Sequence, residues 1–176
     1  MNTNYGPYVY GIGLILGLVS LITLMSRGIL FSYIKPNGKS FFYASIYCIP
    51  IIIILLSIYV LDWYPKGDLG HLNRGIPYPL FPIVYMLILV PIQQIFFFIY
   101  IPKILISQYS LISRYSIIIF CYASIHLYYP QPWIIWGSTL ILGFIWYYIA
   151  NKTQSIWGNM IYHTIIGIIA FTLNYA

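Results

Sequence analysis

Polar side chains are rare in the apolar stretches of this sequence, and those that could do chemistry fall at three places. A polar group in a hydrocarbon environment is costly, so each has a structural or a functional reason to be there. The histidines are the only side chains of the set that exchange protons near neutral pH or readily bind a transition metal. The candidate set consists of Gln93 and Gln94, Tyr122 and His126, and Asn159 and His163.

The spacing at two of these places puts the side chains on a common helix face. Tyr122 and His126 are four residues apart, and so are Asn159 and His163. Residues four apart lie one above the other on an α-helix. We therefore expect both pairs to point into a helical bundle, where they form a buried polar cluster together with the two glutamines.

The composition indicates that the elements positioning these residues cross a lipid bilayer. Hydrophobic residues make up 61% of the 176 residues and charged residues only 6%, whereas a soluble domain carries about 25% charged residues. We predict an all-α, polytopic integral membrane helical bundle of about six transmembrane helices, because the apolar runs have the length of membrane spans. Residues 1–176 are predicted to form a single transmembrane domain.

The predicted spans are bounded by the few charges and by proline or glycine. The fourth is short for a span, and an alternative start lies upstream near Ile104–Ile112. The spans are Tyr8–Leu24, Phe41–Leu61, Pro79–Ile101, Tyr115–Tyr129, Trp133–Ile149 and Ile156–Leu173.

The charges in the loops predict the orientation of the chain. The first, third and fifth loops hold only basic residues, namely Arg27, Lys35, Lys39, Lys103, Arg114 and Lys152. Because positive residues favour the cytoplasmic side, both termini are predicted to be non-cytoplasmic. The basic residues are scattered singly, which argues against nucleic-acid binding. In the second loop, Asp62 and Asp68 with His71 either bind a cation or are solvated polar residues.

Three short segments carry a resemblance to a known family. Gln93-Gln94-Ile95-Phe96-Phe97-Phe98 is followed by Tyr122-Ala123-Ser124-Ile125-His126 and later by His163 with Gly167. Their order and spacing resemble the CPBP membrane proteins, in which Glu-Glu-x-x-x-Arg precedes Phe-x-x-x-His and His-x-x-x-Asn or Asp. That family includes CAAX prenyl-endopeptidases and bacteriocin-processing or immunity proteins. The resemblance covers residues 80–170, a CPBP-like core.

The departures from the family pattern remove its acidic groups. Both glutamates read as glutamine, the arginine as Phe98, the phenylalanine as Tyr122 and the final Asn or Asp as Gly167. In the family, the resemblance implies, one glutamate activates a water while the histidines and a partner hold a metal or stabilise an oxyanion. A glutamine amide neither accepts that proton nor offsets a cation's charge. Two imidazoles alone make a poor zinc site, so we expect no catalytic residue and no metal here.

Three functions follow as hypotheses. The first is a catalytically inactive CPBP-like protein that serves as a small subunit or scaffold of a larger membrane complex, its polar residues acting as hydrogen-bonded links between helices. The alternatives are an active intramembrane metallopeptidase and a bacteriocin self-immunity protein. The expected partners are other membrane protein subunits and the lipid bilayer; no cofactor is expected, although lipid or pigment contacts are compatible with the sequence. The expected location is a bacterial inner membrane or, alternatively, an organellar membrane.

Overall fold

The computed structural model describes residues 6–61, 83–126 and 132–172, and these residues are almost entirely helical. No strand occurs among them. The elements are α1 (Gly6–Ser26), α2 (Leu30–Ile34), α3 (Gly38–Val60), η2 (Tyr85–Leu89), α5 (Val90–Ile95), η3 (Phe96–Leu105), α6 (Leu111–Ser124), α7 (Pro132–Thr153) and α8 (Trp157–Thr172). The predicted all-α class is confirmed.

Several helices begin and end at residues that satisfy their terminal backbone groups. Gly28 takes a φ of 66° after α1, and Ile29 N–H donates to the Leu24 carbonyl across a Schellman turn. The Asn37 side chain accepts a hydrogen bond from Ser40 N–H at the start of α3, at 3.1 Å. Ser110 does the same for Ser113 N–H at the start of α6, at 3.2 Å.

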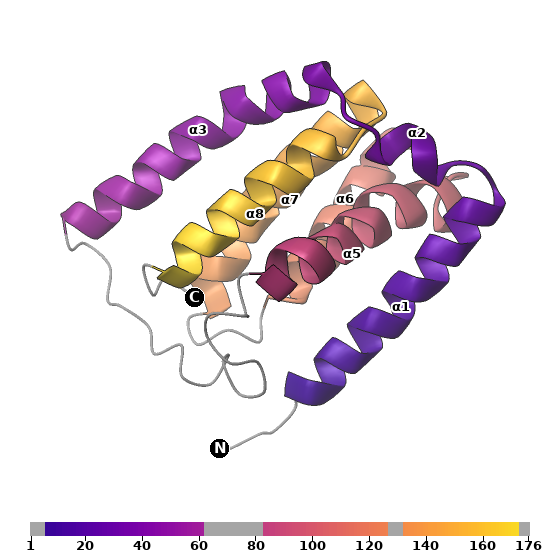
Figure 1. Cartoon of the computed structure of the whole chain (residues 1–176), viewed down its shortest axis with the longest axis horizontal. Helices are drawn as coiled ribbons and strands as arrows, with labels where there is room; N and C mark the ends of the chain where they lie inside the picture. Colours follow the sequence, from indigo (N-terminus) through magenta and orange to yellow (C-terminus); the bar gives the residue numbers. More distant parts are fainter. Residues whose placement is uncertain (1–5, 62–82, 127–131, 173–176) are drawn as a thin grey trace.

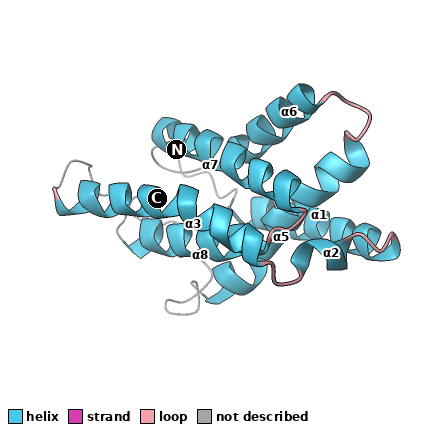
Figure 2. Cartoon of the chain, turned by 90° about the horizontal axis from the view of Figure 1, so that it is seen from above, coloured by secondary structure: helices cyan, strands magenta, loops and turns pink. Residues whose placement is uncertain are grey.

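The helix at Tyr85–Leu105 lies in the middle of the bundle (Figures 1 and 2). It is built from η2, α5 and η3, which run on without a break, and the η segments are π-helical turns with i→i+5 bonding. On one side α1 packs against α5 and η3, while α6, α7 and α8 cover the others; α3 lies outside, against α8 and α7. The central helix therefore contacts most of the elements that carry the predicted polar residues.

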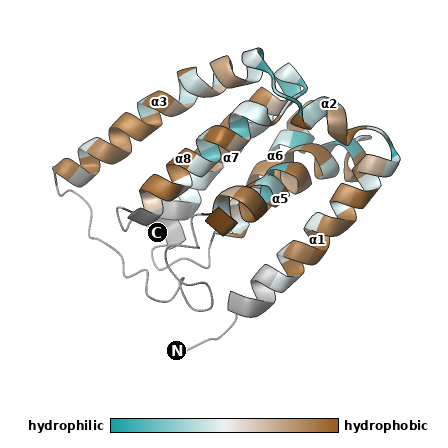
Figure 3. Ribbon diagram, viewed as in Figure 1, coloured by the Kyte–Doolittle hydropathy of each residue, from teal (hydrophilic) through white to brown (hydrophobic). Residues whose placement is uncertain are grey.

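The outer surface of the bundle is apolar. Hydrophobic colours run along α1 and α3 in Figure 3, and large exposed side chains such as Ile15, Ile22, Ile53 and Ile54 lie there. Two described helices, Gly38–Ile58 and Tyr85–Leu105, are long and apolar enough to cross a bilayer. An apolar exterior of this extent suits lipid rather than water as the surrounding medium. The number of crossings, about six, stays a prediction.

The fourth predicted span differs most from the structure. The apolar run predicts a span at Tyr115–Tyr129, whereas α6 begins at Leu111 and ends at Ser124. The Ser110 cap starts the helix four residues early, so Arg114 lies in its first turns as in the upstream alternative. Ile125 caps the helix, and the remainder of the predicted span passes out of the described residues. The loop residues Asp62, Asp68 and His71 also lie outside the described residues.

Candidate functional site

Most of the predicted polar residues meet in the interior, where α5, α6 and α8 approach one another. Gln94 and Asn159 are fully buried, and Tyr122, His126 and His163 are each less than 10% exposed. Each comes from the helix expected to carry it, except that His126 lies just after the end of α6. A set of aromatic rings surrounds them, so the site is enclosed by protein.

His163 is the centre of the site. The Gln94 amide nitrogen donates to His163 Nδ1 over 2.9 Å. An amide nitrogen is only a donor, so Nδ1 is the accepting nitrogen and the proton of the neutral ring sits on Nε2. Nε2 faces the Tyr122 hydroxyl at 3.4 Å, which is a longer and weaker contact. Gln94 thus fixes both the tautomer and the orientation of the ring.

His126 forms a hydrogen bond with the backbone of Tyr122. Its Nδ1 donates to the Tyr122 carbonyl oxygen over 2.9 Å, so its lone pair is on Nε2. Its ring meets the Tyr122 ring edge-on, with centroids 5.0 Å apart, and the His163 ring lies 6.1 Å from the same tyrosine. Tyr122 therefore contacts both histidines.

Asn159 and Gln93 stand apart from this hydrogen-bonded centre. Asn159 donates through its amide nitrogen to the Trp146 carbonyl at 2.8 Å, which ties α8 to α7 rather than to His163. Gln93 is half-buried, and its amide oxygen is buried without a hydrogen-bond partner. Among the described residues, Gln94 bonds to a histidine and Gln93 does not.

Two aromatic residues that the sequence did not single out complete the site. Trp146 stacks on the His163 ring with centroids 6.0 Å apart and planes 21° apart. Tyr85 meets the same ring edge-on at 6.1 Å. A Cβ added to Gly167 would collide with the Tyr85 ring and hydroxyl. At the position where the family motif has Asn or Asp, the space is therefore occupied by Tyr85.

The chemistry open to this centre is that of neutral hydrogen-bonding groups. The chain has two carboxylates, Asp62 and Asp68, and neither belongs to the described residues. Within the described ranges, no three His, Cys, Asp or Glu side chains come close enough together to hold a metal ion. A catalytic zinc needs about three protein ligands. The two imidazoles that contact Tyr122 do not provide that set, so the described residues of this centre do not fit a catalytic metal.

Fold and site together define the class: an all-α membrane helical protein with a histidine-centred polar interior. Residues 75–169 match the family model described as Type II CAAX prenyl endopeptidase Rce1-like. This is more than half of the chain, and the chain belongs to that family. The match overlaps the predicted core at 80–170, so the resemblance read from the motifs is confirmed. Comparison with curated proteins and comparison with solved structures each give no match.

Proposed function

We propose that this protein is a catalytically silent member of its family that serves as a small subunit or scaffold in a larger membrane complex. The observation that carries the proposal is the Gln94–His163 hydrogen bond. An amide occupies the place where a hydrolase of this kind needs a group that accepts a proton and supplies negative charge. General-base catalysis contributes about 10² to 10⁴ in rate, and its loss alone would leave very slow hydrolysis.

The aromatic side chains that fill the site support the same proposal. Tyr85 occupies the space beside Gly167, and Trp146 covers one face of His163. A substrate carbonyl needs room beside the reacting groups, within about 3 Å of a donor that stabilises the oxyanion. Aromatic side chains take up this room around His163, and they give the bundle a packed polar core instead.

The scaffold role is inferred from the short loops and the apolar outer surface of the protein. The described loops between helices are short, whereas the outer faces of α1 and α3 expose many large apolar side chains. Helices associate in a membrane through close packing of such faces. We therefore expect the partners to be other membrane subunits, and we expect no resident cofactor.

The test has two arms. Purification in a mild detergent is expected to recover a stoichiometric membrane partner, and a protein that is monodisperse, alone and functional would contradict the scaffold role. In the second arm, the purified protein is incubated with a prenylated CAAX peptide, with His163→Ala as the matched control. Equal background in both is the expected result. Cleavage that disappears in the control would establish the first alternative, an active intramembrane metallopeptidase, which the family match favours.

We further propose a bacterial inner membrane as the location, with both termini on the non-cytoplasmic side. In Figure 1 α1 begins, and α8 ends, at the end of the bundle opposite α2. Arg27, Lys35 and Lys39 lie around α2, and Lys103 bonds to Gln154 at the same end. A basic end of this kind faces the cytoplasm by the positive-inside rule.

A further inference from the structure

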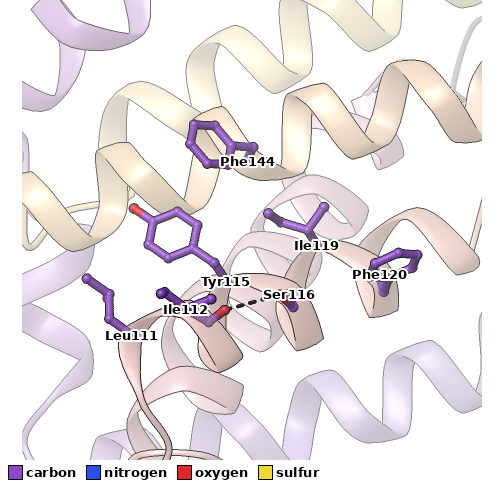
Figure 4. A pocket seen from close by; sticks show the side chains of 7 residues that line it. All are labelled: Leu111, Ile112, Tyr115, Ser116, Ile119, Phe120 and Phe144. Carbon is purple, nitrogen blue, oxygen red and sulfur yellow. Dashed lines mark hydrogen bonds between the residues drawn. The ribbon is translucent and has the colours of Figure 1, made fainter.

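An apolar groove of about 510 Å³ runs along the outer face of α6 and α7 (Figure 4). Leu111, Ile112, Tyr115, Ile119 and Phe120 line it from α6, and Phe144 closes it from α7. Leu111, Ile112, Phe120 and Phe144 are each about half exposed or more, so the groove opens toward the surroundings of the bundle. Its volume lies within the roughly 300–1,000 Å³ of ordinary small-ligand sites.

Tyr115 connects this groove to a buried tyrosine. The rings of Tyr115 and Tyr147 lie edge to face, with centroids 4.5 Å apart. Tyr147 is 2% exposed, and its hydroxyl is buried without a hydrogen-bond partner. A buried hydroxyl without a partner is costly, and this one belongs to the ring that packs on the groove residue Tyr115.

A cation without an acidic partner lies next to the groove residue Tyr115 in α6. Arg114 directly precedes Tyr115 in α6, and the Arg114 Nε is buried without a hydrogen-bond partner. Within the described residues there is no carboxylate to pair with this guanidinium. Guanidinium groups bind phosphate and carboxylate with paired hydrogen bonds.

The surrounding end of the bundle adds positive charge and fixed geometry. Lys103 lies over the Tyr33 ring at 5.6 Å and donates to Gln154 Oε1 at 3.1 Å. The Tyr33 hydroxyl donates to the same oxygen, and Gln154 holds a φ of 51°, which is uncommon for a residue with a side chain. Lys103 is therefore held in position by its contacts with Tyr33 and Gln154.

The geometry points to a binding site for one anionic phospholipid. One acyl chain lies in the α6–α7 groove, and the phosphate accepts hydrogen bonds from the Arg114 guanidinium. An amphiphile is favoured over a partner helix because the apolar groove lies next to Arg114, a cation whose Nε has no hydrogen-bond partner. Anionic headgroups are attracted to basic residues at the membrane surface, and Lys103 adds to this attraction.

The test titrates the detergent-purified full chain with palmitoyl-oleoyl-phosphatidylglycerol or palmitoyl-oleoyl-phosphatidylcholine and counts bound lipids by native mass spectrometry. One phosphatidylglycerol is expected to bind at least about tenfold more tightly than phosphatidylcholine. Arg114→Gln should weaken phosphatidylglycerol binding about tenfold, and Arg114→Lys should restore part of it. Lys35→Gln removes the same charge from an exposed position at the same end and should change binding less than about twofold. Equal losses in Arg114→Gln and Lys35→Gln would overturn the site.

A second pair of variants tests the groove without touching the charges. Ser116 lines the groove, and Ser57 lies on the outer face of α3; both are exposed and donate to the carbonyl four residues earlier. Ser116→Trp should fill the groove and displace the lipid, whereas Ser57→Trp should bind it as the unaltered chain does. Glycerol phosphate, which has the headgroup without acyl chains, should not compete. Competition by glycerol phosphate, or unchanged binding in Ser116→Trp, would overturn the proposal in favour of a simple phosphate site or another occupant of the groove.

Discussion

Replacing Gln94 by leucine tests whether the polar centre serves as a link between helices. Both partners of the Gln94–His163 bond are buried, and their atoms are 2.9 Å apart. Hydrogen bonds between membrane helices contribute about 0.6–2 kcal/mol. Leucine fills a similar volume, so the loss comes from the bond and from the unpaired His163 Nδ1, while removal of Gln94 Oε1, which is buried without a partner, offsets part of it; the net loss is about 1–2 kcal/mol. We expect Gln94→Leu to lower the free energy of unfolding by this amount.

Gln93→Leu is the matched control for this change. It removes an amide from the preceding residue of the same helix, whose oxygen, like Gln94 Oε1, is buried without a hydrogen-bond partner. Its effect is expected to stay within about 0.5 kcal/mol or to be stabilising.

The assay is unfolding of the detergent-solubilised protein by a denaturing detergent, followed by circular dichroism. A double-mutant cycle with His163→Leu isolates the pair from other effects and should give a coupling of about 1 kcal/mol. A coupling below about 0.3 kcal/mol, or equal losses in Gln94→Leu and Gln93→Leu, would refute the reasoning.

Three further predictions concern packing and orientation. Gly158→Ala should destabilise the protein by about 1–3 kcal/mol, because the new Cβ would collide with the Ser40 backbone; Gly137→Ala, which meets nothing within 4 Å, should be neutral or stabilising in the same unfolding assay. Gly167→Ala should be similarly harmful, and Tyr85→Ala in the same chain should recover part of the loss, whereas no recovery would remove Tyr85 as the obstacle. Alkaline phosphatase fused to the C-terminus should be active in a bacterial host. An inactive phosphatase fusion, together with fluorescence from a second fusion to a reporter that works in the cytoplasm, would show the opposite orientation.

The positions of most helices could be predicted because apolar length is a strong signal. The ranges of α1, α3 and α8 lie within three residues of the predicted spans, since charged residues, polar residues or glycine bound the apolar runs. The fourth span was less predictable. A serine cap at Ser110 decided where α6 begins, and its apolar run does not reveal the turn that follows Ser124.

The site could be predicted in its composition but not in its connections. The four-residue spacing brought Tyr122 and His126 into contact, although the turn after α6, and not a continuing helix, makes that contact. Asn159 shares a helix with His163 yet bonds to the Trp146 carbonyl, because the nearest acceptor was on α7. Which of two adjacent glutamines faces His163 depends on how the helix is rotated, and this is set by packing across the whole bundle.

Tyr85 could not be found by regular helix spacing. It precedes Gln94 by nine residues, and in a regular α-helix this separation turns the two side chains about 180° apart. The i→i+5 bonding of η2 inserts roughly one extra residue into the turn and brings Tyr85 round to the side of His163. No periodicity count based on 3.6 residues would have placed it there.

The same widened turn makes the central helix tolerant of a change in chain length. Deleting one residue between Tyr85 and Leu89 would let the turn contract to ordinary i→i+4 bonding, while everything from Val90 onward keeps its place. Tyr85 would rotate by about 100° together with the helical residues before it, and Gly167 would be uncovered. A shortened relative would therefore be expected to carry a larger residue at that glycine, so that helix length and the residue at position 167 would vary together.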